Sequence, residues 1–319
     1  MLGQAAALPL MVRLPFLPSC AIITKGFYYP PLPLSHAIRR QNLSAMSNSS
    51  LLESLSKISG SILHSPFEWC HVDSGNVVLE DATQDGGTKG GTFQVSDFAI
   101  AKYPITNAQY ERFLKHSNGF SNAQWWEFSP EAAQWRKDHK KPKPTAFTGS
   151  NLPRTRVSWF DSMAFCFWLS AELKNTLQDD KPLNIHDVFT WIIRLPAEQE
   201  WQRAAIGDTG WCYPWGNGLD ETRGNYGNNV GQPSNVDKYS AGKSIFGAMN
   251  MIGNLWERCL TGWNQEIIDT SGYTYRVIKG GAWNISNPDY LRANDRGCHP
   301  PRGQLNDCGF RIILDLGLK

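Results

Sequence analysis

The feature that most limits how this chain can fold is its high content of tryptophan together with glycine and proline. The 319 residues include 13 Trp, 28 Gly and 19 Pro. Proline and glycine interrupt helices and central strands, whereas buried tryptophans can hold irregular segments against a core. The composition therefore favours a loop-rich globular domain and argues against a helical bundle, a coiled coil or a solenoid.

Charge and residue spacing exclude several functional classes. With 31 Lys+Arg against 29 Asp+Glu, the formal charge is only +2, which is too small to indicate nucleic-acid binding. No apolar run reaches the roughly 18 residues that a membrane span requires. The seven Cys contain no CxxC and the seven His contain no HxxxH or HExxH, which disfavours a zinc or iron site on a helix. Free or buried thiols in a reducing compartment are the simpler interpretation.

The first 64 residues differ in character from the rest. Prolines interrupt the apolar stretches of residues 1–45, and Arg13 lies inside them, unlike in an ordinary secretory signal. Three interpretations stay open for residues 1–64: a leader, a disordered tail, or a reading frame extended upstream of Met46, with a short helix over residues 51–58. A cytoplasmic location is favoured, with a surface-exposed protein or a lipoprotein cleaved before Cys20 as the alternative. Residues 65–319 are expected to form one domain.

Within that domain the patterns predict few strands and short helices. Thr106 and Gln109 form a capping box before a helix carrying Tyr110, Phe113 and Leu114 on one face. Asp161 caps a second helix, which carries Ala164, Phe165, Trp168 and Leu169 at helical spacing. The other expected elements are a strand over residues 93–100, a polar loop over 117–156, a helix over 196–207, and strands at 276–279 and 309–314. The prediction is an α+β domain with long irregular connections.

Several blocks, in colinear order, resemble one known family. They are Lys102-Tyr103-Pro104-Ile105-Thr106-Asn107, Val157-Ser158-Trp159, Arg194-Leu195-Pro196-Ala197-Glu198-Gln199-Glu200-Trp201, Tyr213-Pro214-Trp215-Gly216, Gly253-Asn254-Leu255-Trp256-Glu257, Gly280-Gly281-Ala282-Trp283 and Gly309-Phe310-Arg311. On these blocks the chain is identified as a member of the sulfatase-modifying-factor, or formylglycine-generating-enzyme-like, family. The resemblance implies a variant of the C-type lectin fold.

The resemblance also tests whether the chain is an oxidase. True formylglycine-generating enzymes carry two cysteines after the Gly-Gly pair, and these bind copper, as soft thiolates can. The matching positions here are Ile285 and Tyr290, which cannot bind copper. A related branch uses non-haem iron and a histidine triad, which this histidine distribution does not offer. No catalytic residue and no copper are therefore expected.

Residues 284–308 resemble the variable region of proteins that retroelements diversify, some of which share this fold. Errors at template adenines turn Asn codons of the AAY type into many others but never into Lys, Glu, Met, Trp or Gln codons. The segment contains no Lys, Glu, Met or Trp, and Gln304 requires a codon outside the mutated class. An ordinary surface loop is the alternative explanation.

The resulting prediction is a non-catalytic binding protein whose ligand is a protein or another surface. Framework residues would hold the backbone while interspersed side chains face outward, as antibody loops do. Tyr290, His299 and Arg302 are the expected anchors. The predicted ligand-binding residues are Trp283, Ile285, Ser286, Asn287, Asp289, Tyr290, Asn294, Gly297, Cys298, His299, Arg302, Leu305, Asn306 and Asp307. An oxidase with relocated chemistry and a fixed accessory sensor domain are the alternatives.

The resemblance implies a structural calcium site as well. Its ligands would be the Asn250 side chain, the Gly253 and Leu255 carbonyls, and Glu257, since Ca²⁺ takes six to eight oxygens. The alternative is that Asn250 and Glu257 tie a loop together through hydrogen bonds. Arg258, next in the chain, stands where many relatives have tryptophan.

Overall fold

The computed structural model describes residues 48–179, 192–265 and 269–315, which belong to one compact unit. Predictions about residues 1–45 lie outside the described residues. The α-helices are α1 (Asn48–Leu63), α2 (Asn107–Lys115), α3 (Pro130–Asp138), α4 (Trp159–Asp179) and α5 (Glu198–Ile206). The strands are β1 (Trp69–Val72), β2 (Gly75–Leu79), β3 (Gly91–Val95), β4 (Phe98–Ala101), β5 (Ile192–Arg194), β6 (Trp256–Gly262), β7 (Arg276–Lys279), β8 (Gly297–His299), β9 (Cys308–Phe310) and β10 (Ile313–Asp315).

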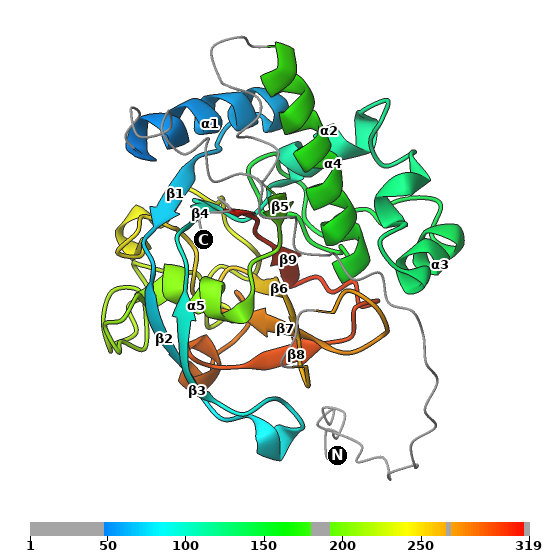
Figure 1. Cartoon of the computed structure of the whole chain (residues 1–319). Helices are drawn as coiled ribbons and strands as arrows, with labels where there is room; N and C mark the ends of the chain where they lie inside the picture. The colour runs from blue at the N-terminus through cyan, green and yellow to red at the C-terminus, as the bar shows by residue number, and fades with distance from the viewer. Residues whose placement is uncertain (1–47, 180–191, 266–268, 316–319) are drawn as a thin grey trace, which may run out of the picture. The chain divides into compact units, whose positions relative to one another are not determined.

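The strands form two four-stranded sheets and one hairpin. The first sheet has the order β1-β4-β10-β5, the second has the order β8-β7-β6-β9, and β2 pairs with β3. All pairings are antiparallel except that of β6 with β9. Figure 1 shows α1, α2, α3 and α4 gathered at one end of this unit, with α5 beside the β2–β3 hairpin. This mixed α+β arrangement confirms the predicted fold class.

The helical end is built around aromatic side chains. Thr106 and Gln109 form the predicted capping box at the start of α2, and Tyr110 and Phe113 point into the core. From α4, Phe165 stacks on Tyr110 with ring centroids 5.7 Å apart. Helix α1 joins the same core through buried leucines, so the helix expected over residues 51–58 exists and is longer.

Residues 117–156 correct a prediction, because they are not simply a polar loop. They contain the short 3₁₀ turn Ala123–Trp126 and helix α3, which begins with Ser129 as its N-cap and Pro130 in its first turn. The indole N–H groups of Trp126 and Trp135 both donate to Asp161 Oδ1, at 3.2 and 3.0 Å. Asp161 Oδ2 also accepts from the Ser158 backbone amide, at 3.3 Å, and from the Ser158 hydroxyl, so its predicted role as a capping carboxylate is confirmed.

Two strand predictions need correction, and strand β6 was not predicted. The expected strand over residues 93–100 is two strands, β3 in the hairpin and fully buried β4 in the first sheet. The expected strand over 309–314 is likewise divided into β9 and β10, which lie in different sheets. Strand β6 went unpredicted because six of its seven residues are buried, so polar and apolar residues do not alternate.

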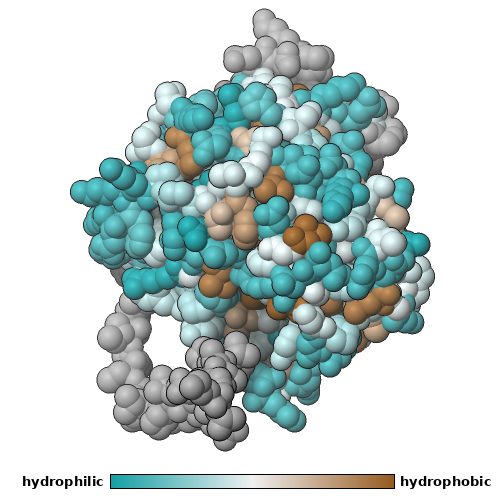
Figure 2. Space-filling view, turned by 180° about the vertical axis from the view of Figure 1, so that it is seen from behind, coloured by the Kyte–Doolittle hydropathy of each residue, from teal (hydrophilic) through white to brown (hydrophobic). Residues whose placement is uncertain are grey.

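The exposed surface is mostly hydrophilic. On the face shown in Figure 2, apolar side chains form separate patches rather than one continuous band. The large hydrophobic side chains with the greatest exposure are Val78, Leu219, Val230, Ile245, Tyr273, Tyr275 and Tyr290. Within the described residues, no helix combines the length and apolarity needed to cross a membrane.

Candidate ligand-binding surface

The predicted binding segment divides into three stretches that differ in burial. The first arm (residues 283–290) is largely exposed, the central stretch (291–296) is partly or fully buried, and the second arm (297–307) is mostly half-buried. The arms are joined at the surface by a hydrogen bond from Asn284 Nδ2 to Asp307 Oδ2 at 3.1 Å. The two arms therefore belong to one surface, with the central stretch beneath it.

Backbone hydrogen bonds hold the first arm in place. The Trp283 and Ile285 carbonyls accept from the backbone amides of Asn228 and Gly227, at 2.7 and 2.8 Å. The Tyr213 hydroxyl donates to the Pro288 carbonyl at 3.3 Å. Because these contacts use backbone atoms of the arm, they do not depend on the identity of its exposed side chains.

The side chains of the first arm differ in how accessible they are to a ligand. Ser286, Asp289 and Tyr290 are exposed, and Tyr290 reaches an exposed fraction of 52%. Asn287 is exposed too, but its Oδ1 accepts from the Asp289 amide and caps the turn that follows. Ile285 packs against the core, and Trp283 is only partly exposed, so these two belong more to the framework than to the surface.

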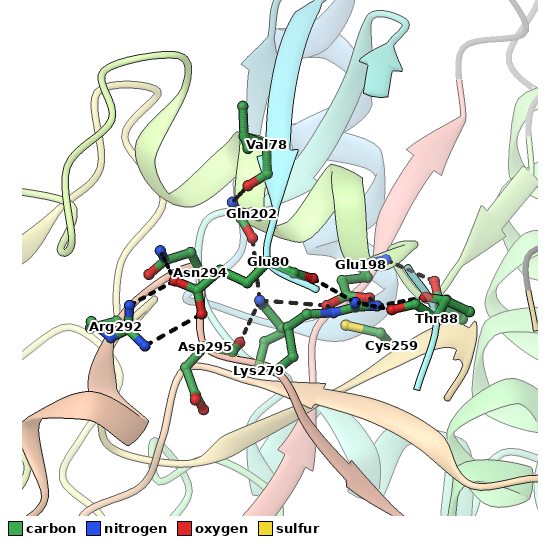
Figure 3. Close-up of polar contacts among 12 residues, drawn as sticks. Val78, Glu80, Thr88, Glu198, Gln202, Cys259, Lys279, Arg292, Asn294 and Asp295 are labelled. Atoms are coloured by element: carbon green, nitrogen blue, oxygen red, sulfur yellow. Dashed lines mark hydrogen bonds and ion pairs between the residues drawn. The ribbon is translucent and has the colours of Figure 1, made fainter. Parts of the chain in front are cut away.

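The central stretch is fixed by apolar burial and by ion pairs. Leu291 and Ala293 are fully buried. The Arg292 guanidinium pairs with Glu80 at 2.7 Å, and Asn294 Nδ2 donates to the same carboxylate at 2.6 Å (Figure 3). Asn294, predicted as a ligand contact, therefore already has an internal partner.

Arg296 makes the most buried pair of the central stretch. Its Nε and Nη2 donate to the two oxygens of Glu198, each at 2.7 Å, and both side chains are almost completely buried. Lys279 Nζ lies 3.7 Å from the same Glu198 carboxylate and is fully buried (Figure 3). Burial lowers the pKa of Lys279 and raises that of Asp295 to about 6. This group of charges connects β7, α5 and the central stretch.

The second arm begins with β8 and then folds over a histidine. His299 is half-buried, and its pKa is lowered by burial and, second, by the nearby Arg258 charge. A Cβ on Gly303 would lie 1.9 Å from His299 Cε1, so any other residue there would displace the His299 ring. Pro301 is buried, and its carbonyl accepts from the Trp159 amide at 2.9 Å. Arg302, between Pro301 and Gly303, is exposed.

The end of the second arm is held by a residue that the sequence did not single out. The Arg156 amide donates to the Leu305 carbonyl at 3.0 Å, and Arg156 Nε donates to Asn306 Oδ1 at 2.6 Å. Arg156 has a positive φ of 56°, a conformation that a non-glycine residue seldom adopts without surrounding support. The sequence signal was weak, since Arg156 only borders the Val157-Ser158-Trp159 block.

The two cysteines of this region, Cys298 and Cys308, are too far apart to bind one metal ion together. Cys298 and Cys308 lie on β8 and β9, the opposite edges of the second sheet. Three strand spacings of about 4.8 Å separate these edges by about 14 Å. Burial raises the pKa of each thiol to about 11. Within the described residues, no three His, Cys, Asp or Glu side chains are grouped to hold a metal ion.

The two side chains predicted as calcium ligands, Asn250 and Glu257, are already hydrogen-bonded to protein groups. Glu257 accepts from Trp201 Nε1 at 2.8 Å and forms a buried ion pair with Arg311 at 2.8 Å. Asn250 Oδ1 accepts from Asn254 Nδ2 at 3.3 Å, and its own amide donates to the Val236 carbonyl. The carboxylate predicted as a ligand is thus neutralised by an arginine, and the remaining donors are neutral oxygens: Asn250 Oδ1 and the Gly253 and Leu255 carbonyls.

Comparison with known proteins identifies the family. The family model of the sulfatase-modifying factor enzyme 1-like domain matches residues 65–316, so the chain belongs to this family. Its similarity to the hercynine oxygenase of Mycolicibacterium smegmatis is 24% identity over 279 residues, 76% of this chain. The formylglycine-generating enzyme of Thermomonospora curvata is 26% identical over 285 residues, which cover 73% of this chain and 86% of that enzyme. The chain spans only 52–58% of the hercynine oxygenases that it matches.

Solved structures support the same fold. Treponema denticola variable protein 1 superposes with a TM-score of 0.54 and 20% identity, covering 77% of this chain and 94% of that protein. The expected C-type lectin-like fold of the family is therefore confirmed, as is the resemblance to a variable protein.

Proposed function

We propose that this protein is a non-catalytic, ligand-binding member of the family, and that its two arms form the binding surface. The observation that carries the proposal is that residues 283–307 combine buried side chains, which hold the backbone, with exposed side chains, which can contact a ligand. Leu291 is fully buried, whereas its neighbour Tyr290 is 52% exposed. A fixed backbone with outward-facing side chains is the arrangement that recognition loops require. The fold shared with Treponema denticola variable protein 1 supports this role.

We propose further that a retroelement diversifies the exposed positions. Ser286, Asp289, Tyr290 and Arg302 are reachable from AAY codons, and all four side chains are exposed. Changes at these positions would alter the surface without disturbing the core. Cys308 is reachable too, but it is fully buried, so the proposal does not place it among the ligand contacts.

Sequencing the gene and several kilobases on either side tests the diversification. A reverse transcriptase gene and a near-copy of the 3′ end, differing opposite template adenines, are the expected result. Deep sequencing of the 3′ end in a grown population should show changes at the codons for Ser286, Asp289, Tyr290 and Arg302. The codon for buried Leu291 is the internal control. Absence of the near-copy and of codon variation would overturn the diversification and leave a fixed sensor or scaffold.

An oxidase is the alternative that the relatives suggest, because hercynine oxygenase and formylglycine-generating enzyme are among them. The direct test is oxygen consumption by the purified chain with Cu(I) and a cysteine-containing peptide. We expect no consumption above that of free copper. Copper-dependent consumption that is lost in Cys298→Ser would contradict the non-catalytic proposal.

We also propose that the segment of residues 250–257 binds calcium and that the ion has a structural role. It is supported by the neutral donors Asn250 Oδ1 and the Gly253 and Leu255 carbonyls, but not by a free Glu257 carboxylate. Thermal melting in CaCl₂, in MgCl₂ and in chelator should show a higher midpoint in calcium alone, because a ligand of the folded state stabilises it. Equal midpoints in all three solutions would remove calcium from the description.

A further inference from the structure

The second arm is surrounded by arginines that have no acidic partner. Arg156, Arg258, Arg276 and Arg302 surround residues 297–307, and we call them the arginine cluster. Within the described ranges, none of the four has a carboxylate oxygen within ion-pairing distance. In the central stretch, by contrast, Arg292 and Arg296 each pair with a glutamate.

The two buried members of the cluster carry uncompensated charge. Arg258 is fully buried; its Nε donates to the Val157 carbonyl at 3.2 Å and its Nη2 to the Gly303 carbonyl at 2.6 Å. Its Nη1 is buried without any hydrogen-bond partner. Arg276, also fully buried, stacks on Trp159 at 4.1 Å and donates only to carbonyls. Buried charges are usually paired, so these two leave a positive field under the arm.

The other two members present the charge at the surface. Arg302 is exposed, and its guanidinium stacks on the Tyr273 ring, 4.0 Å from the centroid. Arg156 is partly exposed, and its Nε donates to Asn306 Oδ1, whereas its terminal nitrogens have no hydrogen-bond partner among the described residues. Arg302 Nη2 also donates to the Tyr273 hydroxyl, so its Nε and Nη1 and the terminal nitrogens of Arg156 are the groups that can donate to an incoming anion.

The acidic side chains of the neighbourhood make hydrogen bonds rather than ion pairs with the cluster. Asp307 accepts from Asn284, and Asp269 accepts from its own turn at Ser271. Asp161 accepts from two indoles and Ser158 at the start of α4. These carboxylates weaken the positive field around the arm, but none of them occupies a guanidinium.

The edge of the second sheet adds a second, independent feature. Strand β8 is the outer strand of that sheet and pairs only with β7. Within the described residues, no hydrogen bond reaches its other edge. An exposed edge can accept an extended polypeptide as an additional strand. The β8 edge therefore favours a polypeptide ligand over a nucleic acid or a free phosphate.

We infer that the second arm binds an acidic, extended polypeptide segment, which adds to the edge of β8 while its carboxylates contact Arg156 and Arg302. The inference rests on the proposed binding function and names the ligand class of that surface. Three of the four arginines lie outside residues 283–308, so the positive charge would persist if the arm itself were diversified. Only the contribution of Arg302 would then differ between copies.

The test uses the full chain and a fluorescein-labelled oligo-glutamate peptide, followed by fluorescence anisotropy at low ionic strength. Arg302→Gln and Arg156→Gln should each weaken binding at least about threefold, and the double variant about tenfold or more, since exposed charge-assisted contacts have this size. Arg112→Gln, at an exposed position of α2 and without an ion pair among the described residues, is the charge-matched control and should change binding little. Equal weakening by all three single variants would show non-specific charge attraction and overturn the inference.

Two further measurements separate the polypeptide ligand from other anions. Hydrogen exchange at residues 297–299 should slow when the peptide binds, because β8 gains backbone hydrogen bonds. A thymidine oligonucleotide of matched charge should bind more weakly; equal binding through the same arginines would replace the polypeptide by a general anion. If sequencing shows variable codons but the peptide does not bind, this inference fails and the proposed function stands. If the peptide binds and codons are constant, the diversification fails alone.

Discussion

The central stretch and the second arm both depend on basic residues, but they neutralise them in different ways. In the central stretch, Arg296 and buried Lys279 share Glu198, and Arg292 pairs with Glu80. Around the second arm, Arg258 and Arg276 are equally buried but contact only carbonyls and one aromatic ring. The arginines of the central stretch are thus paired with carboxylates and hold the backbone, whereas the arginines around the second arm, where we place the ligand, have no carboxylate partner among the described residues.

The largest effect is expected at the shared carboxylate of the central stretch. Glu198→Gln leaves Arg296 and Lys279 buried without their counter-charge, so we expect a loss of about 3–5 kcal/mol in the free energy of unfolding. Urea denaturation measures it. Glu53→Gln, which removes an exposed pair with Lys57, is the control and should change stability by less than about 0.5 kcal/mol. A similarly small loss at Glu198 would mean that the central stretch is not fixed by its ion pairs.

Neighbouring residues at the junction of the first arm and the central stretch give the second prediction. Leu291→Ala should cost about 2–5 kcal/mol, because it opens a cavity in a fully buried site. Tyr290→Ala should cost less than about 0.5 kcal/mol, since 52% of Tyr290 is exposed. The pair is compared by thermal and urea unfolding. A large loss in Tyr290→Ala would place Tyr290 in the core and remove it from the binding surface.

The sequence predicted local features of this framework well and its long-range pairs poorly. The capping box at Thr106 and the capping carboxylate Asp161 could be predicted because their partners lie three residues away. Ser129 and Pro130 also carried a usable helix-start signal, although the segment was assigned to a loop. Glu80 and Arg292, which are 212 residues apart, meet only when the chain folds, and no local pattern encodes that contact.

The same distinction applies to the candidate surface. The segment 283–308 was found from its composition, but which of its residues face outward depends on neighbours far away in sequence. Asn294 was predicted as a ligand contact because it is a polar residue of the variable pattern, yet Glu80 accepts its amide hydrogen. Arg156 was missed because its contacts to residues 305 and 306 cross about half of the chain.

A third prediction concerns pH and the central stretch. Burial raises the pKa of Asp295 from 3.8 to about 6, so between these values the folded state holds a proton that the unfolded state has released. Ionisation of Asp295 therefore lowers the free energy of unfolding as the pH rises from 3.8 to about 6. This cost is absent below pH 3.8 and complete above about pH 6. Asp295→Asn should stabilise the protein at pH 7 by about 1–2 kcal/mol, after allowance for partial exposure and the lost attraction to Lys279.

Urea unfolding at pH 7 and at pH 4 checks this prediction, because the gain should be small at the lower pH. Asp289→Asn is the control, since Asp289 is exposed on the first arm and its substitution should change the free energy of unfolding by less than about 0.5 kcal/mol. A gain of equal size at both pH values would mean that the substitution acts through packing rather than through the buried charge.

The smallest effect is expected where the two arms meet. Asn284→Ala removes the hydrogen bond to Asp307, which lies at the surface, so the free energy of unfolding should change by less than about 0.5 kcal/mol. Local opening is a more sensitive measure than global unfolding, because it reports only the contacts that hold one segment. Hydrogen exchange at residues 304–307 should therefore accelerate, whereas the central stretch should exchange as before. Asn229→Ala, an exposed asparagine whose side chain makes no hydrogen bond within the described residues, should leave both unchanged. Faster exchange in the central stretch would show that its ion pairs depend on the arms, and the two regions would then be one unit.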